Sequence, residues 1–262
     1  FFLTVLSISS FRYIPFLVYA TAPVTALYLS NMTEGRIIRN RAIKVLAGVA
    51  VVIILIIAVK GFNKSLEEAL KHEIRAYRFP EAAASFVLEN HPSGNIFNNF
   101  NWGGYLIWRL YPAYRVFIDG RTLRLEALMD YTKALWNELD AKNIFNYYGI
   151  NIVMIPGLSP FTGELYELVN ILKNDEQWHL IFTDETAMVF VRGIENQDII
   201  RKYSLPKTEA YTHVIKEAEF KLMSGFQSPH LWLALEKAFK EKGLIREAMQ
   251  AHENALKMQG RH

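Results

Sequence analysis

The stretch WHLIFTDETAMVFVR, residues 178–192, is the clearest indication of fold in the globular part of this chain. Its two halves are rich in β-branched and aromatic residues, as strands are. Only Glu185 and Thr186 lie between them, so we expect an antiparallel hairpin. Helical patterns alternate with further strand-like runs before this hairpin, which predicts an α/β fold with a mixed sheet. Those runs are NIFNNF (95–100), RVFIDG (115–120) and INIVMIP (150–156).

Helices are expected between the strands and throughout the C-terminal part. Pro80 opens the run PEAAASFVLEN, at a first-turn position where its missing N–H costs nothing. The run LWLALEKAFKEKGLIREAMQAHENALKM (231–258) has large residues, then Gly243, then small residues. This spacing resembles one tetratricopeptide repeat, although Glu236 stands where a small residue is usual. A plain amphipathic helix pair is the alternative. Other helical patterns occupy 125–139, 141–149 and 163–175.

Residues 1–59 are almost continuously apolar. A helix that spans a membrane needs about 20 apolar residues, so this composition predicts membrane helices. One would end in Phe1–Ile8, the next would cover Ile14–Leu29, and the last would cover 42–59. A signal peptide cleaved near Ala20-Thr21-Ala22 is the alternative.

The short loop NMTEGRIIRNRAIK, residues 31–44, gives the expected orientation and domain organisation. It carries more basic than acidic residues, and such loops stay in the cytoplasm. Residues after Lys60 are therefore expected outside the cytoplasm, in an integral protein of a prokaryotic cytoplasmic membrane. The expected parts are membrane helices with this cytoplasmic loop (1–60), an extracytoplasmic α/β domain (61–205) and a helical, tetratricopeptide-like hairpin (206–262). Because the chain starts at Phe1 without Met, we interpret it as a C-terminal fragment.

Composition and motifs exclude several classes of function. The net charge is only +3 and no arm of clustered Lys and Arg exists, which argues against nucleic acid as a partner. The chain has no Cys, so it has no disulfides and no thiolate metal sites. It also lacks a phosphate-binding loop, a nucleophile elbow and His residues at metal-ligand spacing. We therefore expect no cofactor and no metal site within these residues.

The densest group of chemically versatile residues is FNNFNWGGYLIWRLYPAYRVFIDGR, residues 97–121, expected as a strand–turn–strand unit. Gly103 and Gly104 would let the backbone approach another group closely. The aromatic rings here offer flat surfaces with polar edges, as sugar- and peptide-binding sites do. The residues expected to face a substrate or acceptor are Asn101, Trp102, Tyr105, Arg109, Asp119 and Arg121.

An alternative assigns purely structural roles to the same residues. Trp102 and Trp108 would belong to the core, Asp119-Gly120 would form a tight turn, and Arg121 would be solvated or paired with a carboxylate. Arg12 is a separate candidate, because an arginine beside a membrane span is costly without a partner. At headgroup level it could pair with a phosphate, and snorkelling at a helix end is its alternative.

The run SFRYIPFLVYATAP (10–23), followed by a basic loop, a last span and an outside domain, resembles the end of multi-pass C-type glycosyltransferases. The resemblance implies transfer of a sugar from a polyprenyl-phosphate carrier. Two pieces resemble the catalytic subunit of oligosaccharyltransferase, in which an arginine before the Pro-containing helix binds the lipid diphosphate; here that role falls on Arg12. FNWGGYLIWR followed by RVFIDGR stands where that family has a Trp-Trp-Asp-Tyr-Gly motif and an Asp-containing strand.

The chain also departs from this family. Asn101-Trp102-Gly103 has no carboxylate, so recognition of an Asn-x-Ser/Thr acceptor does not carry over. The more similar group is bacterial C-type glycosyltransferase-like proteins with W-G-G-Y and F-I-D-G-R motifs and terminal tetratricopeptide repeats. The resemblance covers most of residues 10–195. It implies catalytic acidic residues, and a divalent metal if one is used, in early loops outside this fragment.

Together these observations predict the C-terminal portion of a glycosyltransferase. Its partners would be membrane lipid, a polyprenyl-phosphate-linked sugar and a protein or glycan acceptor. The alternative is a non-catalytic assembly protein that presents the α/β domain and the repeat helices to a protein partner.

Overall fold

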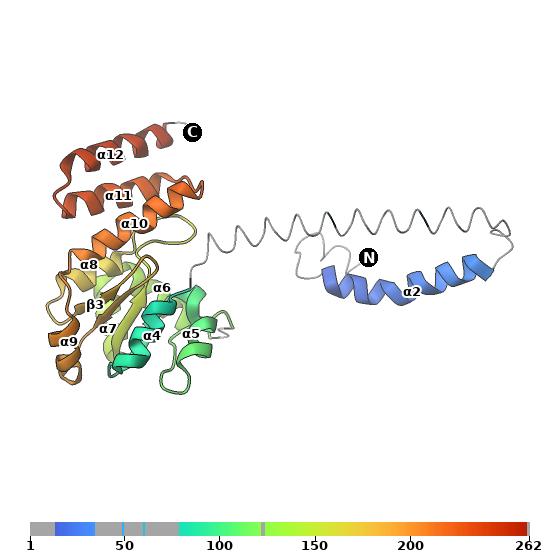
Figure 1. Ribbon diagram of the computed structural model, residues 1–262, viewed down its shortest axis with the longest axis horizontal. Helices are drawn as coiled ribbons and strands as arrows, with labels where there is room; N and C mark the ends of the chain where they lie inside the picture. Colours follow the sequence, from blue (N-terminus) through green and yellow to red (C-terminus); the bar gives the residue numbers. More distant parts are fainter. Residues whose placement is uncertain (1–13, 35–48, 50–59, 61–78, 122–123, 261–262) are drawn as a thin grey trace. The chain divides into compact units, whose positions relative to one another are not determined.

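The computed structural model describes residues 14–34, 49, 60, 79–121 and 124–260 (Figure 1). Contacts divide the chain into two compact units, Phe1–Lys71 and His72–His262. Several predicted features lie outside the described residues. They are the helix end at 1–8, Arg12, the basic loop from residue 35 onward, and the span at 42–59 apart from Val49.

In the first unit, helix α2 runs from Ile14 to Glu34 and contains Pro23. Among the described residues, no helix has the length and apolar character needed to cross a membrane. The prediction of membrane helices, and of an integral membrane protein built on them, is therefore contradicted. The prediction relied on the absence of charge, but α2 also includes polar residues and continues past Leu29 into SNMTE. The hydroxyls of Thr21 and Thr25 donate hydrogen bonds back to carbonyl groups of their own helix.

The second unit is built on a four-stranded sheet in the order β1-β2-β4-β3. The strands are β1 (Asn95–Asn98), β2 (Ile150–Ile155), β3 (His179–Thr183) and β4 (Met188–Val191). β1 and β2 are parallel, with Ile96 opposite Ile152, whereas β4 is antiparallel to both β2 and β3. The predicted mixed sheet and the predicted hairpin of residues 178–192 are confirmed.

Helices follow the strands in chain order. The α-helices of this unit are α4 (Glu81–Asn90), α5 (Gly103–Leu110), α6 (Leu125–Trp136), α7 (Glu138–Tyr147), α8 (Glu167–Asn174), α9 (Gln197–Tyr203), α10 (Glu209–Met223), α11 (Pro229–Glu241) and α12 (Ile245–Gln259). Short 3-10 helices are η3 (Phe100–Trp102) and η4 (Ile194–Asn196).

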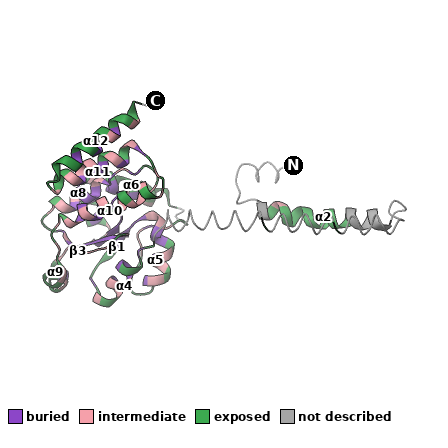
Figure 2. Cartoon of the chain, turned by 45° about the horizontal axis from the view of Figure 1, so that its top comes forward, coloured by how far each residue is buried: buried purple, intermediate pink, exposed green. Residues whose placement is uncertain are grey.

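Both faces of the sheet are buried, so the unit has three layers (Figure 2). On one face, Phe97, Val153 and Phe190 pack in a core with α6, α7, α8 and α10. On the other face, Ile96 and Ile152 pack with α4, α5 and α9. Strands covered on both faces need apolar residues at consecutive positions, which explains the run INIVMI in β2.

Two predicted elements differ from those observed. The helix predicted over 125–139 breaks at Asn137, whose side-chain oxygen accepts a hydrogen bond from the Asp140 amide at 3.0 Å and caps α7. The strand predicted at 115–120 makes a single bridge, between Val116 and Ile96. Pro80 immediately precedes α4, where the chain was expected to start a helix.

The C-terminal part is helical, as predicted. Figure 1 shows α10, α11 and α12 in succession, coloured from orange to red. Ala248, Ala251 and Ala255 are buried where α12 packs on α11. Gly243 joins the two helices with φ of 75°, a conformation that favours glycine. Within this part, α11 and α12 therefore form an antiparallel helix pair.

Candidate functional site

The region around α5 is organised by Asn98, at the end of β1. This side chain is fully buried and holds the neighbouring segment 117–118 against the strand. Its oxygen accepts hydrogen bonds from the amides of Phe117 (2.8 Å) and Ile118 (3.3 Å). Its Nδ2 donates to the carbonyl groups of Ile118 and Asn99, both at 2.9 Å. One amide side chain thereby replaces the backbone pairing that a continuous strand would supply.

Gly103 begins α5 at the point where the chain passes closest to segment 118–119. A Cβ at Gly103 would lie 2.2 Å from the Ile118 carbonyl oxygen and 2.5 Å from the Asp119 Cα. A Cβ at Gly104 would have no atom within 4 Å. The glycine pair therefore contains one position that requires glycine and one that does not.

The prediction of a strand–turn–strand unit over 97–121 is wrong in its middle. GGYLIWRL forms helix α5, in which Gly103, Leu106 and Leu110 are buried. These positions are three and four residues apart, the spacing of one helix face. The two adjacent glycines and the unbroken apolar run YLIW hid this pattern in the sequence.

Asn101 and Trp102 lie in η3, before this helix. The Asn101 amide donates a hydrogen bond to the Asn99 side-chain oxygen at 3.0 Å. Trp102 is 6% exposed and packs in the core on the α4 and α5 side of the sheet. The prediction that Trp102 faces a substrate is therefore wrong, because its ring packs in the core against α5.

Asp119 and Arg121 form an ion pair at the turn that follows. Arg121 donates from Nε to Oδ1 at 2.9 Å and from Nη2 to Oδ2 at 3.2 Å. These bonds lower the pKa of Asp119 below the usual value of an aspartate. A lowered pKa stabilises the fold above the ordinary carboxyl range, and this contribution is lost as the pH falls. The contribution is small, because the Arg121 side chain is 78% exposed.

An aromatic surface lies on the outer side of α5. It consists of Phe79, Tyr105 and Trp108, and is called the α5 aromatic face below. The rings of Phe79 and Tyr105 stack with centroids 5.0 Å apart, and the rings of Tyr105 and Trp108 lie 5.8 Å apart. Trp108 is 74% exposed and Phe79 is 53% exposed. Rings in contact with one another form an apolar cluster that solvent reaches through the exposed Phe79 and Trp108.

Arg109 places a cation beside the α5 aromatic face. Its guanidinium carbon lies 5.8 Å from the centre of the Trp108 ring, and Nη2 donates to the Ser85 hydroxyl at 2.9 Å. Its Nε is buried and has no hydrogen-bond partner. The bond to Ser85, on α4, fixes the position of the guanidinium beside the Trp108 ring.

The structure brings some of the predicted site residues together and not others. Tyr105 and Arg109 lie one turn apart on α5, with Arg109 bonded to Ser85 of α4, whereas Asp119 lies against Gly103, the first residue of α5. Phe79 and Ser85 were missed by the sequence analysis. No local pattern marks them, because their part in the site depends on the packing of α4 and its preceding residue against α5.

Among the described residues, no group of three or more His, Asp or Glu side chains could hold a metal ion. Comparisons with protein-family models, curated proteins and solved structures find no match to this chain. They therefore do not support assigning the chain to the glycosyltransferases or the helix pair α11–α12 to the tetratricopeptide repeats. We describe α11 and α12 simply as a packed helix pair.

Proposed function

We propose that the α/β domain binds the acceptor in a sugar-transfer reaction whose donor is a polyprenyl-phosphate-linked sugar. The observation that supports this proposal is the exposed ring of Trp108, flanked by Tyr105 and by the guanidinium of Arg109. A sugar ring presents C–H groups on its faces and hydroxyls at its edge. An aromatic plane with hydrogen-bond donors beside it matches both.

The donor side of the proposal rests on the resemblance of residues 10–195 alone. In it, Arg12 would hold the carrier phosphate, and the acidic catalytic groups would lie outside residues 1–262. The described residues would supply acceptor binding: Trp108 and Tyr105 through their rings, and Arg109 through the positive charge of its guanidinium beside Trp108. Asp119 and Arg121 would shape the turn beside α5 through their ion pair.

Replacing Trp108 by alanine is expected to weaken acceptor binding by about 10- to 30-fold, because the largest exposed ring of the α5 aromatic face is lost. The measurement is saturation-transfer NMR and titration of the intact chain with a panel of defined oligosaccharides and short peptides. The matched control is Tyr147→Ala, which removes a ring that is 82% exposed on α7. The proposal is contradicted if the panel binds equally to both variants and to the unchanged protein, or if no member binds at all.

A second candidate function is supported by α12. Its Ala248 side faces α11, whereas Ile245, Met249 and Leu256 are 59%, 63% and 52% exposed. These three positions are four and seven residues apart, so they form one apolar stripe along the helix. Such a stripe is suited to a helical partner, which supports the alternative of a non-catalytic assembly protein.

This candidate predicts a position-dependent crosslink. A photo-reactive residue at Met249 is expected to capture a discrete protein partner in cells that express the intact chain, because the stripe would lie in the interface. The control is Gln250, which is exposed on the same helix but points away from the stripe. Equal crosslinking from both positions, or none from either, would exclude α12 as a specific docking surface.

A further inference from the structure

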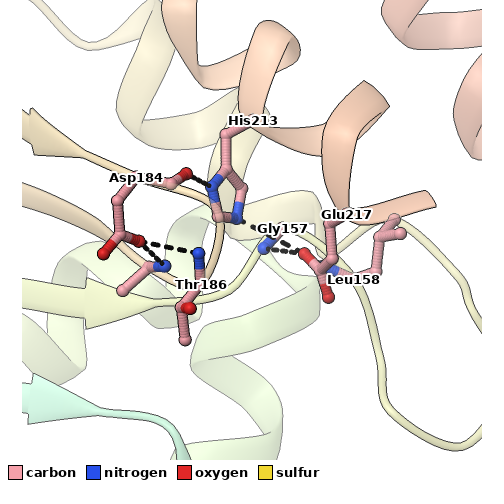
Figure 3. Close-up of polar contacts among 7 residues, drawn as sticks. Gly157, Leu158, Asp184, Thr186, His213 and Glu217 are labelled. Atoms are coloured by element: carbon pink, nitrogen blue, oxygen red, sulfur yellow. Dashed lines mark hydrogen bonds and ion pairs between the residues drawn. The ribbon is translucent and has the colours of Figure 1, made fainter. Parts of the chain in front are cut away.

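Helix α10 carries a buried histidine and a carboxylate one turn apart (Figure 3). His213 is 1% exposed, and its Nδ1 lies 2.8 Å from the backbone carbonyl oxygen of Asp184, in the turn between β3 and β4. A carbonyl oxygen only accepts hydrogen bonds, so Nδ1 must carry a hydrogen. In a neutral ring, Nε2 would then be a lone pair without hydrogen.

The carboxylate of Glu217 anchors α10 to the end of β2. Its Oε2 accepts hydrogen bonds from the backbone amides of Gly157 (2.8 Å) and Leu158 (3.1 Å). The contact is close, because a Cβ at Gly157 would lie 2.7 Å from Val214 and 3.3 Å from both Glu217 and His213. A loop 60 residues away in sequence is thus tied to α10 by one oxygen atom.

The two side chains face each other across a short gap. His213 Nε2 lies 3.4 Å from Glu217 Oε2, and Nε2 has no hydrogen-bond partner. The histidine side chain is fully buried and the glutamate side chain is 13% exposed. If the ring were neutral and Glu217 ionised, two acceptors would face each other away from water, which is costly.

Other titratable groups around the pair do not resolve this conflict. The Asp184 carboxylate accepts hydrogen bonds from the amides of Thr186 and Ala187, at 2.7 and 2.8 Å. Burial, Tyr131 and the charge of Glu217 raise the pKa of Tyr166, so that phenol stays neutral. Glu185 follows Asp184 in the same turn and brings a further negative charge. In the described part of the chain, His213 is the sole ion-pair partner of Glu217.

We infer that His213 and Glu217 hold one shared proton between Nε2 and the carboxylate, and that this proton closes a pH-sensitive clasp between α10 and the sheet. With the proton present, the facing groups attract, and α10 stays attached to both the end of β2 and the β3–β4 turn. When rising pH removes the proton, the facing groups repel. The anchor at Gly157 and Leu158 then opens more often. Because α11 packs on α10, the clasp controls how the helical C-terminal part is held.

The first test reads the proton directly in the unchanged protein. In the intact chain labelled with ¹⁵N-histidine and ¹³C-glutamate, NMR at neutral pH is expected to show one of two signatures. Either both ring nitrogens of His213 carry hydrogen, or the Glu217 carboxyl carbon has the shift of the neutral acid. A His213 ring with hydrogen on Nδ1 alone, beside an ionised Glu217, would overturn the inference.

The second test measures the clasp. As the pH rises, amide hydrogen exchange at Gly157 and Leu158 is expected to accelerate by about ten-fold or more beyond the intrinsic effect of base, because a charged hydrogen bond is lost. In the E217Q variant, the side-chain oxygen still accepts from both amides, but the side chain carries no negative charge that could face the neutral ring. That variant should show no such acceleration.

The chain offers a matched control for these measurements. His252 Nδ1 lies 2.8 Å from Glu236 Oε2 in a second histidine–glutamate pair, but the His252 side chain is 50% exposed. H252Q is expected to leave the exchange of Gly157 and Leu158 as in the unchanged protein. The same pH dependence in the unchanged protein and in E217Q would remove the clasp.

Discussion

Replacing Asn98 by leucine is expected to lower the free energy of unfolding by about 3–5 kcal/mol. The two side chains have the same branching and number of non-hydrogen atoms, so the change leaves no cavity and the loss comes mainly from the hydrogen bonds. The amides of Phe117 and Ile118 and the carbonyl groups of Asn99 and Ile118 would remain without this partner in a fully buried place. Each unsatisfied buried group costs about 1–3 kcal/mol. Some of these groups would find other partners as segment 117–118 shifts, so the total loss is smaller than the full sum over all of them.

The measurement is urea-induced unfolding of the intact chain, followed by near-ultraviolet circular dichroism. The control is Asn95→Ala in the same strand, which removes one exposed hydrogen bond to the Tyr148 carbonyl (2.8 Å). That change should cost about 0.5–1.5 kcal/mol. Equal losses for the two variants would mean that Asn98 does not hold segment 117–118.

Replacing Gly103 by alanine is expected to cost about 3 kcal/mol of stability. The new methyl group would overlap backbone atoms of Ile118 and Asp119, which cannot rotate away as the end of a flexible side chain can. Overpacking of this kind typically costs about 1–3 kcal/mol, and the contact with a backbone oxygen places this site at the upper end.

The adjacent Gly104 provides the matched control. Gly104→Ala meets no atom within 4 Å and replaces a poor helix former inside α5. It is therefore expected to stabilise the protein by up to about 1 kcal/mol. Opposite signs for neighbouring glycines, measured in the same urea titrations, would establish the close approach of α5 to segment 118–119. A stable Gly103→Ala variant would refute it.

The candidate site depends on tertiary packing more than on sequence pattern. The sequence analysis placed Trp102, but not Trp108, among the residues expected to face a substrate, and its structural alternative put both rings in the core. In the structure, Trp102 is 6% exposed and Trp108 is 74% exposed, although both belong to one short run. No periodicity was long enough to separate them, because α5 spans only Gly103–Leu110 and follows a 3-10 turn. Phe79 and Ser85 join the site through α4, which no local signal could indicate.

The membrane prediction failed for a different reason. It was built on the near absence of charge in residues 1–59, but apolar composition does not fix where a helix ends. α2 continues to Glu34, and no helix among the described residues is both long and apolar enough to cross a membrane. Arg12, the residue that the resemblance assigned to the carrier phosphate, lies outside those residues.

By itself, the sequence determined the features that depend on neighbours in the chain. The hairpin of β3 and β4 follows from two β-rich runs separated by Glu185-Thr186, and the turn between α11 and α12 follows from Gly243. Which buried polar groups meet depends on how the helices and strands pack. His213 reaches Asp184, and Glu217 reaches Gly157, because α10 packs across the sheet. The partners are 29 and 60 residues apart in the sequence. Hydrophobic periodicity reports on local secondary structure, so it cannot show which distant residues come into contact.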